Sequence, residues 1–210
     1  MPKTETMVTI ALCAALNLAL GSAVFLLKAP IYLDMVGTIL CALLFCDTAR
    51  KAFLSSATAG VISFILGGLL VNPFLPWFSG SVVAVAAVTA FVTCRSARTL
   101  RNEAPNRKRF YFAVLGYGIL TGVIAAIVSA PIVVYLFGGV TGSGSALIVA
   151  FFLKTGHQLL QAAFLSGFTA EPIDKTLQLL IAVVLFRATP ESFISAIKKG
   201  PTGKTAEQLR

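Results

Sequence analysis

The chain has 210 residues, of which 57% are hydrophobic and 12% charged, and its mean hydropathy of +0.89 lies far outside the range of soluble globular domains. The length suits one integral membrane domain over residues 1–210 and leaves no room for a second. The formal net charge of +9 does not indicate a nucleic-acid partner, because the cations lie at the ends of apolar runs, where they indicate contact with cytoplasm and anionic membrane lipid.

Apolar runs long enough to cross a membrane follow one another along the chain. A hydrocarbon core of about 30 Å needs roughly 20 helical residues. We expect an all-α membrane bundle with six transmembrane helices, at residues 7–27, 30–46, 53–71, 81–97, 110–137 and 172–187. Gly167 and Pro172 predict a break before the last helix, which leaves 146–168 as a partial or re-entrant helix. Counting 146–168 as a full span gives the alternative of seven crossings.

The loops between these runs are of two kinds. Loops 47–52 and 95–109 and the tail 190–210 are rich in Lys and Arg, whereas loops 71–80 and 138–145 carry no charge. Short loops rich in Lys and Arg stay in the cytoplasm. The chain is therefore predicted to lie in the inner membrane of a prokaryotic cell with both termini cytoplasmic. A seventh span would place the basic tail outside, so the charge rule favours six.

Small residues recur every four positions in two of the runs. The first run carries Ala11, Ala15, Ala19 and Ala23. The fifth run carries Gly118, Gly122, Ala126 and Ala130. Such stripes let helix backbones approach closely in lipid, where the hydrophobic effect contributes little to helix association. For the fifth run the simplest interpretation is packing inside the bundle.

Polar side chains other than Lys and Arg gather toward the outer loops. The candidate substrate-binding residues there are Tyr32, Asp34, Asn72, Trp77, Thr141, Ser143 and Ser145. Helical spacing would add Lys154, His157, Gln158 and Gln161 on one polar face of the partial helix. We expect hydrogen bonds from the amides and hydroxyls, stacking by Trp77 or Tyr32, and ion pairing by Asp34 or Lys154. This distribution predicts a cup that opens to the outside and binds a small molecule.

Nothing in the sequence predicts catalysis, a metal or a cofactor. His157 has no His or Cys neighbour at ligand spacing, and the four cysteines lack the spacing of a metal site. No nucleophile–base pair stands out. The simplest role of Asp174 is to cap the N-terminus of the last helix.

The chain resembles the substrate-binding S components of energy-coupling factor (ECF) vitamin transporters of prokaryotes. The resemblance rests on the size, on the six-span pattern with cytoplasmic ends, and on the stripe Ala11, Ala15 and Ala19. It also rests on the segment 30–38, Pro-Ile-Tyr-Leu-Asp-x-x-Gly-Thr, together with Asp174-Lys175 before the last span.

The resemblance implies a subunit that takes a vitamin-like ligand from outside. It would dock through the alanine stripe on a transmembrane coupling protein that carries two cytoplasmic ATPases, and topple in the membrane to release the ligand inside. The chain has no Walker sequence, so ATP hydrolysis would belong to those partners. The expected ligand is a flat, polar, mostly neutral heterocycle, pyridoxine-like or hydroxymethylpyrimidine-like, with riboflavin, nicotinate or a queuosine precursor as alternatives.

Two other classes of function stay open. A stand-alone secondary carrier or exporter would usually show an internal repeat with paired broken helices, and no such repeat is visible. An intramembrane enzyme acting on lipid would place clustered acidic or His residues near the cytoplasmic face, where the sequence has only Asp47 and Glu103.

Overall fold

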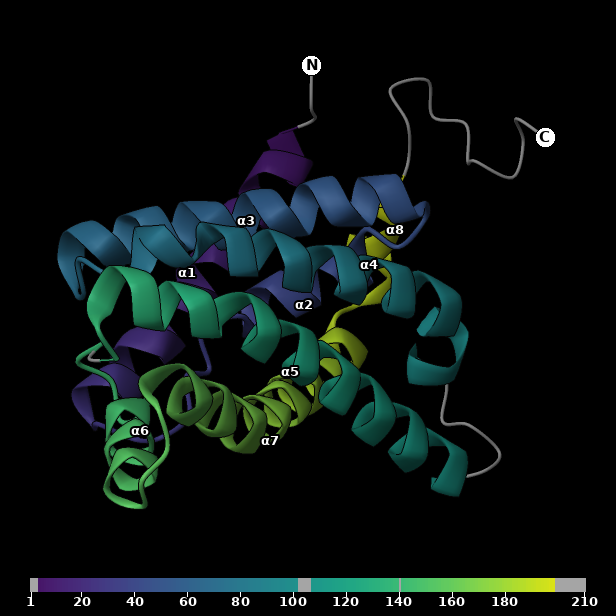
Figure 1. Ribbon diagram of the computed structural model, residues 1–210. Helices are drawn as coiled ribbons and strands as arrows, with labels where there is room; N and C mark the ends of the chain where they lie inside the picture. Colours follow the sequence, from purple (N-terminus) through teal and green to yellow (C-terminus); the bar gives the residue numbers. More distant parts are fainter. Residues whose placement is uncertain (1–3, 102–106, 140, 199–210) are drawn as a thin grey trace.

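The computed structural model describes residues 4–101, 107–139 and 141–198, and all its regular elements over those ranges are helical (Figure 1). The elements are α1 (Thr4–Leu26), α2 (Val36–Leu44), α3 (Ala49–Leu70), the short 3₁₀ helix η1 (Leu75–Phe78), α4 (Ser79–Arg101), α5 (Arg107–Phe137), α6 (Ser145–Lys154), α7 (Leu159–Ala188) and α8 (Glu191–Lys198). The prediction of an all-α fold is confirmed. Glu103 lies outside the described residues.

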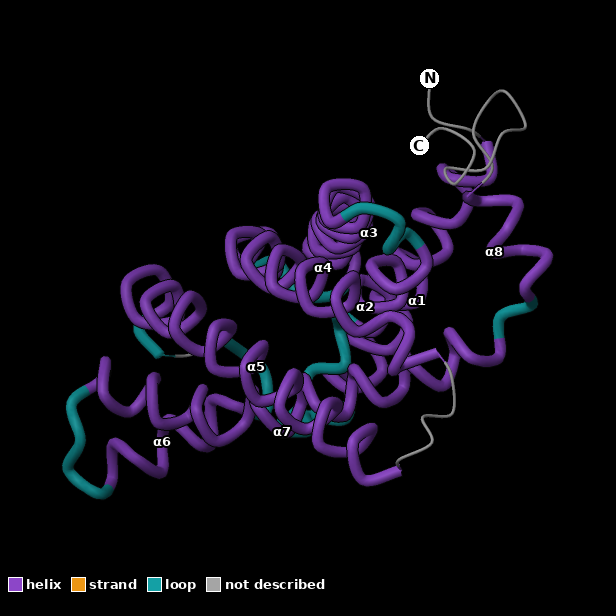
Figure 2. Tube along the Cα trace, turned by 90° about the vertical axis from the view of Figure 1, so that its right-hand side faces the viewer, coloured by secondary structure: helices purple, strands orange, loops and turns teal. Residues whose placement is uncertain are grey.

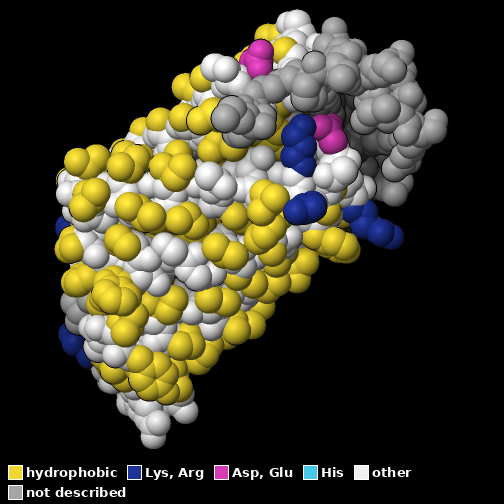
Figure 3. All heavy atoms as spheres, turned by 90° about the horizontal axis from the view of Figure 1, so that it is seen from above, with side chains coloured by type: hydrophobic (Ala, Val, Ile, Leu, Met, Phe, Trp, Pro, Cys, Tyr) yellow, Lys and Arg dark blue, Asp and Glu magenta, His cyan; other side chains and the backbone are white. Residues whose placement is uncertain are grey.

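Several of these helices suit a membrane protein. Within the described ranges, four segments are long and apolar enough to cross a bilayer: Thr4–Leu26, Ala49–Leu70, Leu75–Ser96 and Phe110–Phe137. The helices α7 and α8 pass the same test as a pair, although the chain bends by 99° between them. Large apolar side chains are exposed, among them Leu69 (79%) and Phe112 (74%). Figure 3 shows hydrophobic side chains spread over one face of the molecule. A surface this apolar is suited to lipid rather than water.

The helix α2 forms the centre of the bundle. It lies among α1, α3, α4 and α7 and packs against each of them (Figure 2). Eight of its nine residues are buried. The predicted helix 30–46 is correct only in its second half, because residues 29–33 have no regular structure and α2 begins at Val36. Two residues with left-handed backbone, Lys28 (φ 53°) and Leu33 (φ 50°), and the intervening Pro30 explain the interruption.

The predicted partial helix over 146–168 is wrong in its boundaries. The helix α6 ends before Gly156, whose φ of +91° terminates it, and a reciprocal capping box between Gln158 and Gln161 starts α7 at Leu159. The helix α7 then continues across Gly167 and Pro172, where the break was expected. With 10 residues, α6 rises only about 15 Å and does not by itself cross a hydrocarbon core.

The helices α5 and α7 pack closely through the glycines of α5. A Cβ atom on Gly118 would overlap Thr176, and one on Gly122 would overlap the backbone at Pro172. The prediction that this small-residue stripe packs inside the bundle is confirmed. Pro172 has no backbone N–H and so leaves one helical hydrogen bond of α7 unmade. The backbone of α5 packs directly against α7 at this position.

We expect Gly122→Leu to lower the free energy of unfolding by about 1–3 kcal/mol or more, because the new side chain would have to displace backbone. Thermal unfolding of the detergent-solubilised protein measures this. Gly116→Leu on the same helix is the matched control, since a Cβ there meets nothing within 4 Å. Equal melting temperatures for the two variants would contradict the close packing of α5 on α7.

The three loops predicted to lie outside meet at one end of the bundle. The Lys28 ammonium donates to the Gly142 carbonyl at 2.9 Å, and the Asn72 amide donates to the Thr141 carbonyl at 3.5 Å. Gly144 lies directly against the backbone of Lys28 and Ala29. Segments more than 65 positions apart in the sequence are thus brought together, which is the arrangement that a cup at this end requires.

Candidate functional site

A cavity of about 120 Å³ lies inside the bundle at the end where these loops meet. Most of its wall is apolar, including Leu18, Phe25, Phe64, Phe78 and Val133. Its polar lining includes Asn17, Tyr32, Asp34, Ser63, Asn72, Ser129, Glu171 and Lys175. Small-molecule sites are typically built in this way, from an apolar concavity with a few convergent polar groups.

Six of the predicted site residues line this cavity. They are Tyr32, Asp34, Asn72, Thr141, Ser143 and Ser145. The three hydroxyls form a chain, with oxygen–oxygen distances of 2.8 Å from Thr141 to Ser143 and 2.8 Å from Ser143 to Ser145. Because a hydroxyl both donates and accepts, this chain can reorient to match either kind of group on a ligand.

The other four predicted residues lie outside the cavity. Trp77 belongs to η1 and is 61% exposed, whereas Phe78 stacks on Phe137 and the Phe74 ring packs against Phe137 at a tilt. Lys154, His157 and Gln158 are exposed because the break between α6 and α7 removes the shared helical face that the spacing predicted. The His157 ring bonds only locally, and Gln158 caps α7.

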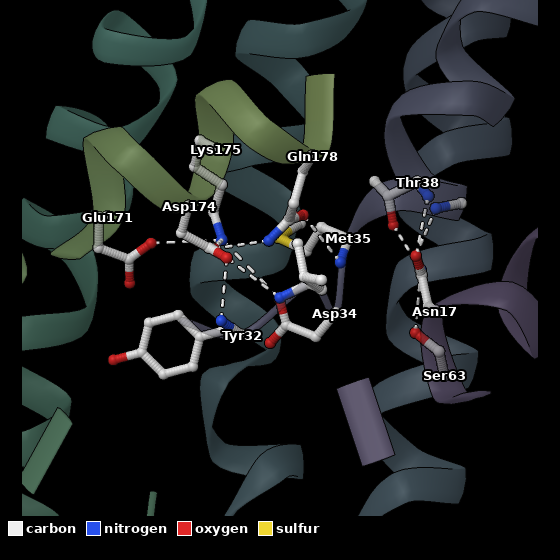
Figure 4. A network of polar contacts seen from close by, with 12 residues as sticks. Asn17, Tyr32, Asp34, Met35, Thr38, Ser63, Glu171, Asp174, Lys175 and Gln178 are labelled. Carbon is white, nitrogen blue, oxygen red and sulfur yellow. Dashed lines mark hydrogen bonds and ion pairs between the residues drawn. The ribbon is translucent and has the colours of Figure 1, made fainter. Parts of the chain in front are cut away.

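The helix α7 presents a polar ridge to the segment between α1 and α2. Its members are Glu171, Asp174, Lys175 and Gln178, which share one face of the helix (Figure 4). Asp174 does not cap a helix N-terminus as expected. Its Oδ1 accepts hydrogen bonds from the backbone N–H groups of Tyr32 (2.9 Å) and Leu33 (3.0 Å). Its Oδ2 accepts from Lys175 Nζ (2.7 Å) and Gln178 Nε2 (2.6 Å).

The ridge thus replaces the hydrogen bonds that the irregular segment cannot make with itself. Gln178 Oε1 accepts from the N–H of Met35 at 3.0 Å, at the start of α2. Backbone N–H groups buried without a partner are costly, so non-helical chain inside a membrane bundle persists only where protein groups satisfy it. Asp174 and Gln178 hold the segment that carries Tyr32 and Asp34 against the cavity.

Asn17 on α1 also accepts hydrogen bonds from backbone N–H groups, here at the start of α2. Its Oδ1 accepts from the N–H groups of Gly37 (2.6 Å) and Thr38 (3.2 Å), in the first turn of α2. Its Nδ2 donates to the hydroxyls of Thr38 (2.8 Å) and Ser63 (3.2 Å). Met35, at the N-cap position, provides no side-chain cap. Asn17 therefore supplies the acceptor that the first turn of a helix needs, from a neighbouring helix.

A cluster of ionic side chains lies where the ridge meets the cavity. Lys175 Nζ is 2.7 Å from Asp174, 3.3 Å from Glu171 and 3.8 Å from Asp34. The loop that carries Asp34 lies outside the long apolar helices. Burial raises the pKa of the Asp34 carboxyl above its usual range, Lys175 opposes this effect, and Asp174 adds to it. Three carboxylates thus surround one ammonium group.

Asn17, Glu171 and Lys175 were not among the predicted site residues, although the sequence carries a signal for each. Asn17 is the single amide in the first apolar run, and the α7 ridge repeats at spacings of three and four. Polar residues at such positions inside apolar runs indicate buried, functional groups.

Comparisons with protein-family models, with curated proteins and with solved structures found no match for this chain. Within the part of the chain that the structure describes, no three His, Cys, Asp or Glu side chains are placed to hold a metal ion.

Proposed function

We propose that this protein is the substrate-binding S component of an ECF-type importer, which takes up a vitamin or vitamin precursor. The observation that carries the proposal is the cavity, lined by side chains from the loops that the charge rule places outside. A site at that end accepts a molecule from outside the cell, and the chain carries no nucleotide-binding motif of its own.

The irregular segment before α2 supports a binding role. Membrane transport proteins place discontinuous helices at their substrate sites, because unwound backbone and helix N-termini offer polar groups that a continuous helix would use internally. Here the segment contributes Ile31, Tyr32 and Asp34 to the cavity wall. Three side chains from other helices, Asn17, Asp174 and Gln178, hold it in place.

The alanine stripe supports a docking role. Ala11, Ala15 and Ala19 are exposed on α1, whereas Cys13, Ala14 and Asn17 face the bundle. The stripe is therefore not used for packing within the described part of the chain, in contrast to the glycine stripe of α5. Its proposed partners are the transmembrane coupling protein and, through it, two cytoplasmic ATPase subunits.

Native mass spectrometry of the protein gently extracted from its host membrane tests the binding function. We expect a bound molecule of vitamin size on the wild type and its loss from Asp34→Ala, because Asp34 lines the cavity. His157→Ala is the matched control and is expected to retain the molecule, since His157 is exposed outside the cavity. If the wild-type protein carries only lipid, the result would favour a lipid-handling enzyme or a secondary carrier instead.

A further inference from the structure

The charges at the cavity wall do not balance. Lys175 is 4% exposed in its side chain and faces Asp174 (0% exposed), Glu171 (9%) and Asp34 (19%). Asp174 alone receives four hydrogen bonds, from two backbone N–H groups, Lys175 and Gln178. The carboxylate of Asp174, the closest partner of Lys175, is therefore fully hydrogen-bonded without any ligand. Glu171 and Asp34 are left as two carboxylates with only a longer contact to the same ammonium group.

Both of these carboxylates have an oxygen without a hydrogen-bond donor. Among the described residues, Oε2 of Glu171 and Oδ1 of Asp34 are buried and accept no hydrogen bond, although both face Lys175 Nζ, at 3.3 and 3.8 Å. Both residues line the cavity, and Lys175 is the one Lys or Arg among its described lining residues. A buried carboxylate without donors is costly. Donors on a bound molecule would supply what the protein lacks.

The surroundings suit a positively charged group with an apolar body. The Tyr32 ring lines the cavity, and Lys175 Nζ lies 5.7 Å from its centroid, so this ring already accepts a cation at its face. The remaining wall offers the aromatic rings of Phe25, Phe64 and Phe78. An anionic group would meet three carboxylates and the single ammonium group of Lys175.

We propose that the ligand carries a protonated or permanently cationic nitrogen, which binds to Glu171 and Asp34 while its ring or alkyl body packs on the apolar wall. This inference rests on the proposed function and narrows it. The expected mostly neutral heterocycle becomes one with a basic or quaternary nitrogen, and carboxylate-bearing vitamins such as nicotinate are rejected.

A matched pair of probes tests the inference without any change to the protein. Pyridoxamine and pyridoxine differ by an aminomethyl in place of a hydroxymethyl group. We offer both to the purified wild-type protein at equal concentration, together with thiamine, nicotinate and a polar metabolite extract of the expression host, and read the adducts by native mass spectrometry at pH 7. The expected adducts carry a cationic nitrogen.

Two variants locate the contact. Glu171→Gln and Asp34→Asn keep the size of each side chain and remove its charge, and each is expected to weaken binding of the cationic adduct about tenfold to a hundredfold. Asp47→Asn is the control, because its ion pair with Lys51 lies outside the cavity and is expected to leave binding unchanged. Thermal unfolding establishes that each variant is folded.

The outcomes separate this inference from the proposed function. Adducts that are neutral or anionic would overturn the cationic ligand and leave the binding subunit intact. A cationic adduct that binds Glu171→Gln and Asp34→Asn as tightly as the wild type would overturn the assigned contact. The absence of any small-molecule adduct would overturn both the inference and the proposed function.

Discussion

Asp174→Ala is expected to lower the free energy of unfolding by about 3–5 kcal/mol and to abolish ligand binding, because one carboxylate joins two parts of the fold. Its loss leaves the N–H groups of Tyr32 and Leu33 without acceptors and deprives Lys175 of its closest partner. The segment that carries Asp34 then loses its attachment to α7. Thermal unfolding measures the first effect, and native mass spectrometry measures the second.

Comparing Asp174→Asn with Asp174→Ala separates the loss of the carboxylate charge from the loss of the hydrogen-bond acceptor. Asp174→Asn keeps an oxygen that accepts from both backbone N–H groups but removes the charge next to Lys175, so we expect a loss between those of the wild type and Asp174→Ala. Asp47→Ala is the control for removing an ion pair. It breaks the partly exposed contact with Lys51 at 3.0 Å, and exposed pairs of this kind contribute about 0–1 kcal/mol. An Asp174→Ala protein as stable as Asp47→Ala would show that the carboxylate does not hold the segment.

Ala15→Trp is expected to reduce uptake more than tenfold while ligand binding to the purified protein stays unchanged. The indole would stand out from the middle of the exposed stripe Ala11, Ala15 and Ala19 and separate α1 from a helix of the proposed coupling protein. The measurement pairs ligand uptake into cells that express the coupling protein and ATPases with native mass spectrometry of the variant and with its co-purification with the ATPases.

Ala87→Trp on α4 is the matched control, because Ala87 is also exposed on a long apolar helix but lies outside the stripe. It is expected to leave uptake and co-purification unchanged. Loss of ligand binding by Ala15→Trp would mean that the substitution disturbs the fold. Undiminished uptake would mean that the partner docks elsewhere, or that the protein transports alone as a secondary carrier.

The features that could be predicted from the sequence depend on residues close to one another along the chain. Hydropathy averaged over some 20 residues located the long apolar helices, since helix formation in lipid depends mainly on local composition. The alternation of basic and uncharged loops grouped Tyr32, Asp34, Asn72 and the 141–145 hydroxyls, and these residues meet in one cavity. Two predicted spans separate loop 71–80 from loop 138–145, so both loops must lie on the same side of the membrane. The sequence could therefore group their side chains without any information on helix packing.

Helix ends were less predictable, because opposing local signals compete. Gly167 and Pro172 predicted a break, yet α7 runs through both, since α5 approaches closely at Gly122 and the packing of two long helices outweighs the lost hydrogen bond. The chain instead breaks at 155–158, where the capping box forms. Only one continuous helix would bring Lys154, His157 and Gln158 to the site, and with the break they lie outside the cavity.

Composition and charge order thus determined by themselves that this is an apolar helical chain with its polar groups gathered at one end. Which of these groups form the site depends on tertiary contacts. Asp174 reaches Tyr32 across 142 positions of sequence, and Asn17 reaches Ser63 across 46. No local pattern encodes such pairs, because they depend on which faces of α1, α2 and α7 pack together. The irregular segment before α2 is stable only when those faces supply the hydrogen bonds that it cannot make itself.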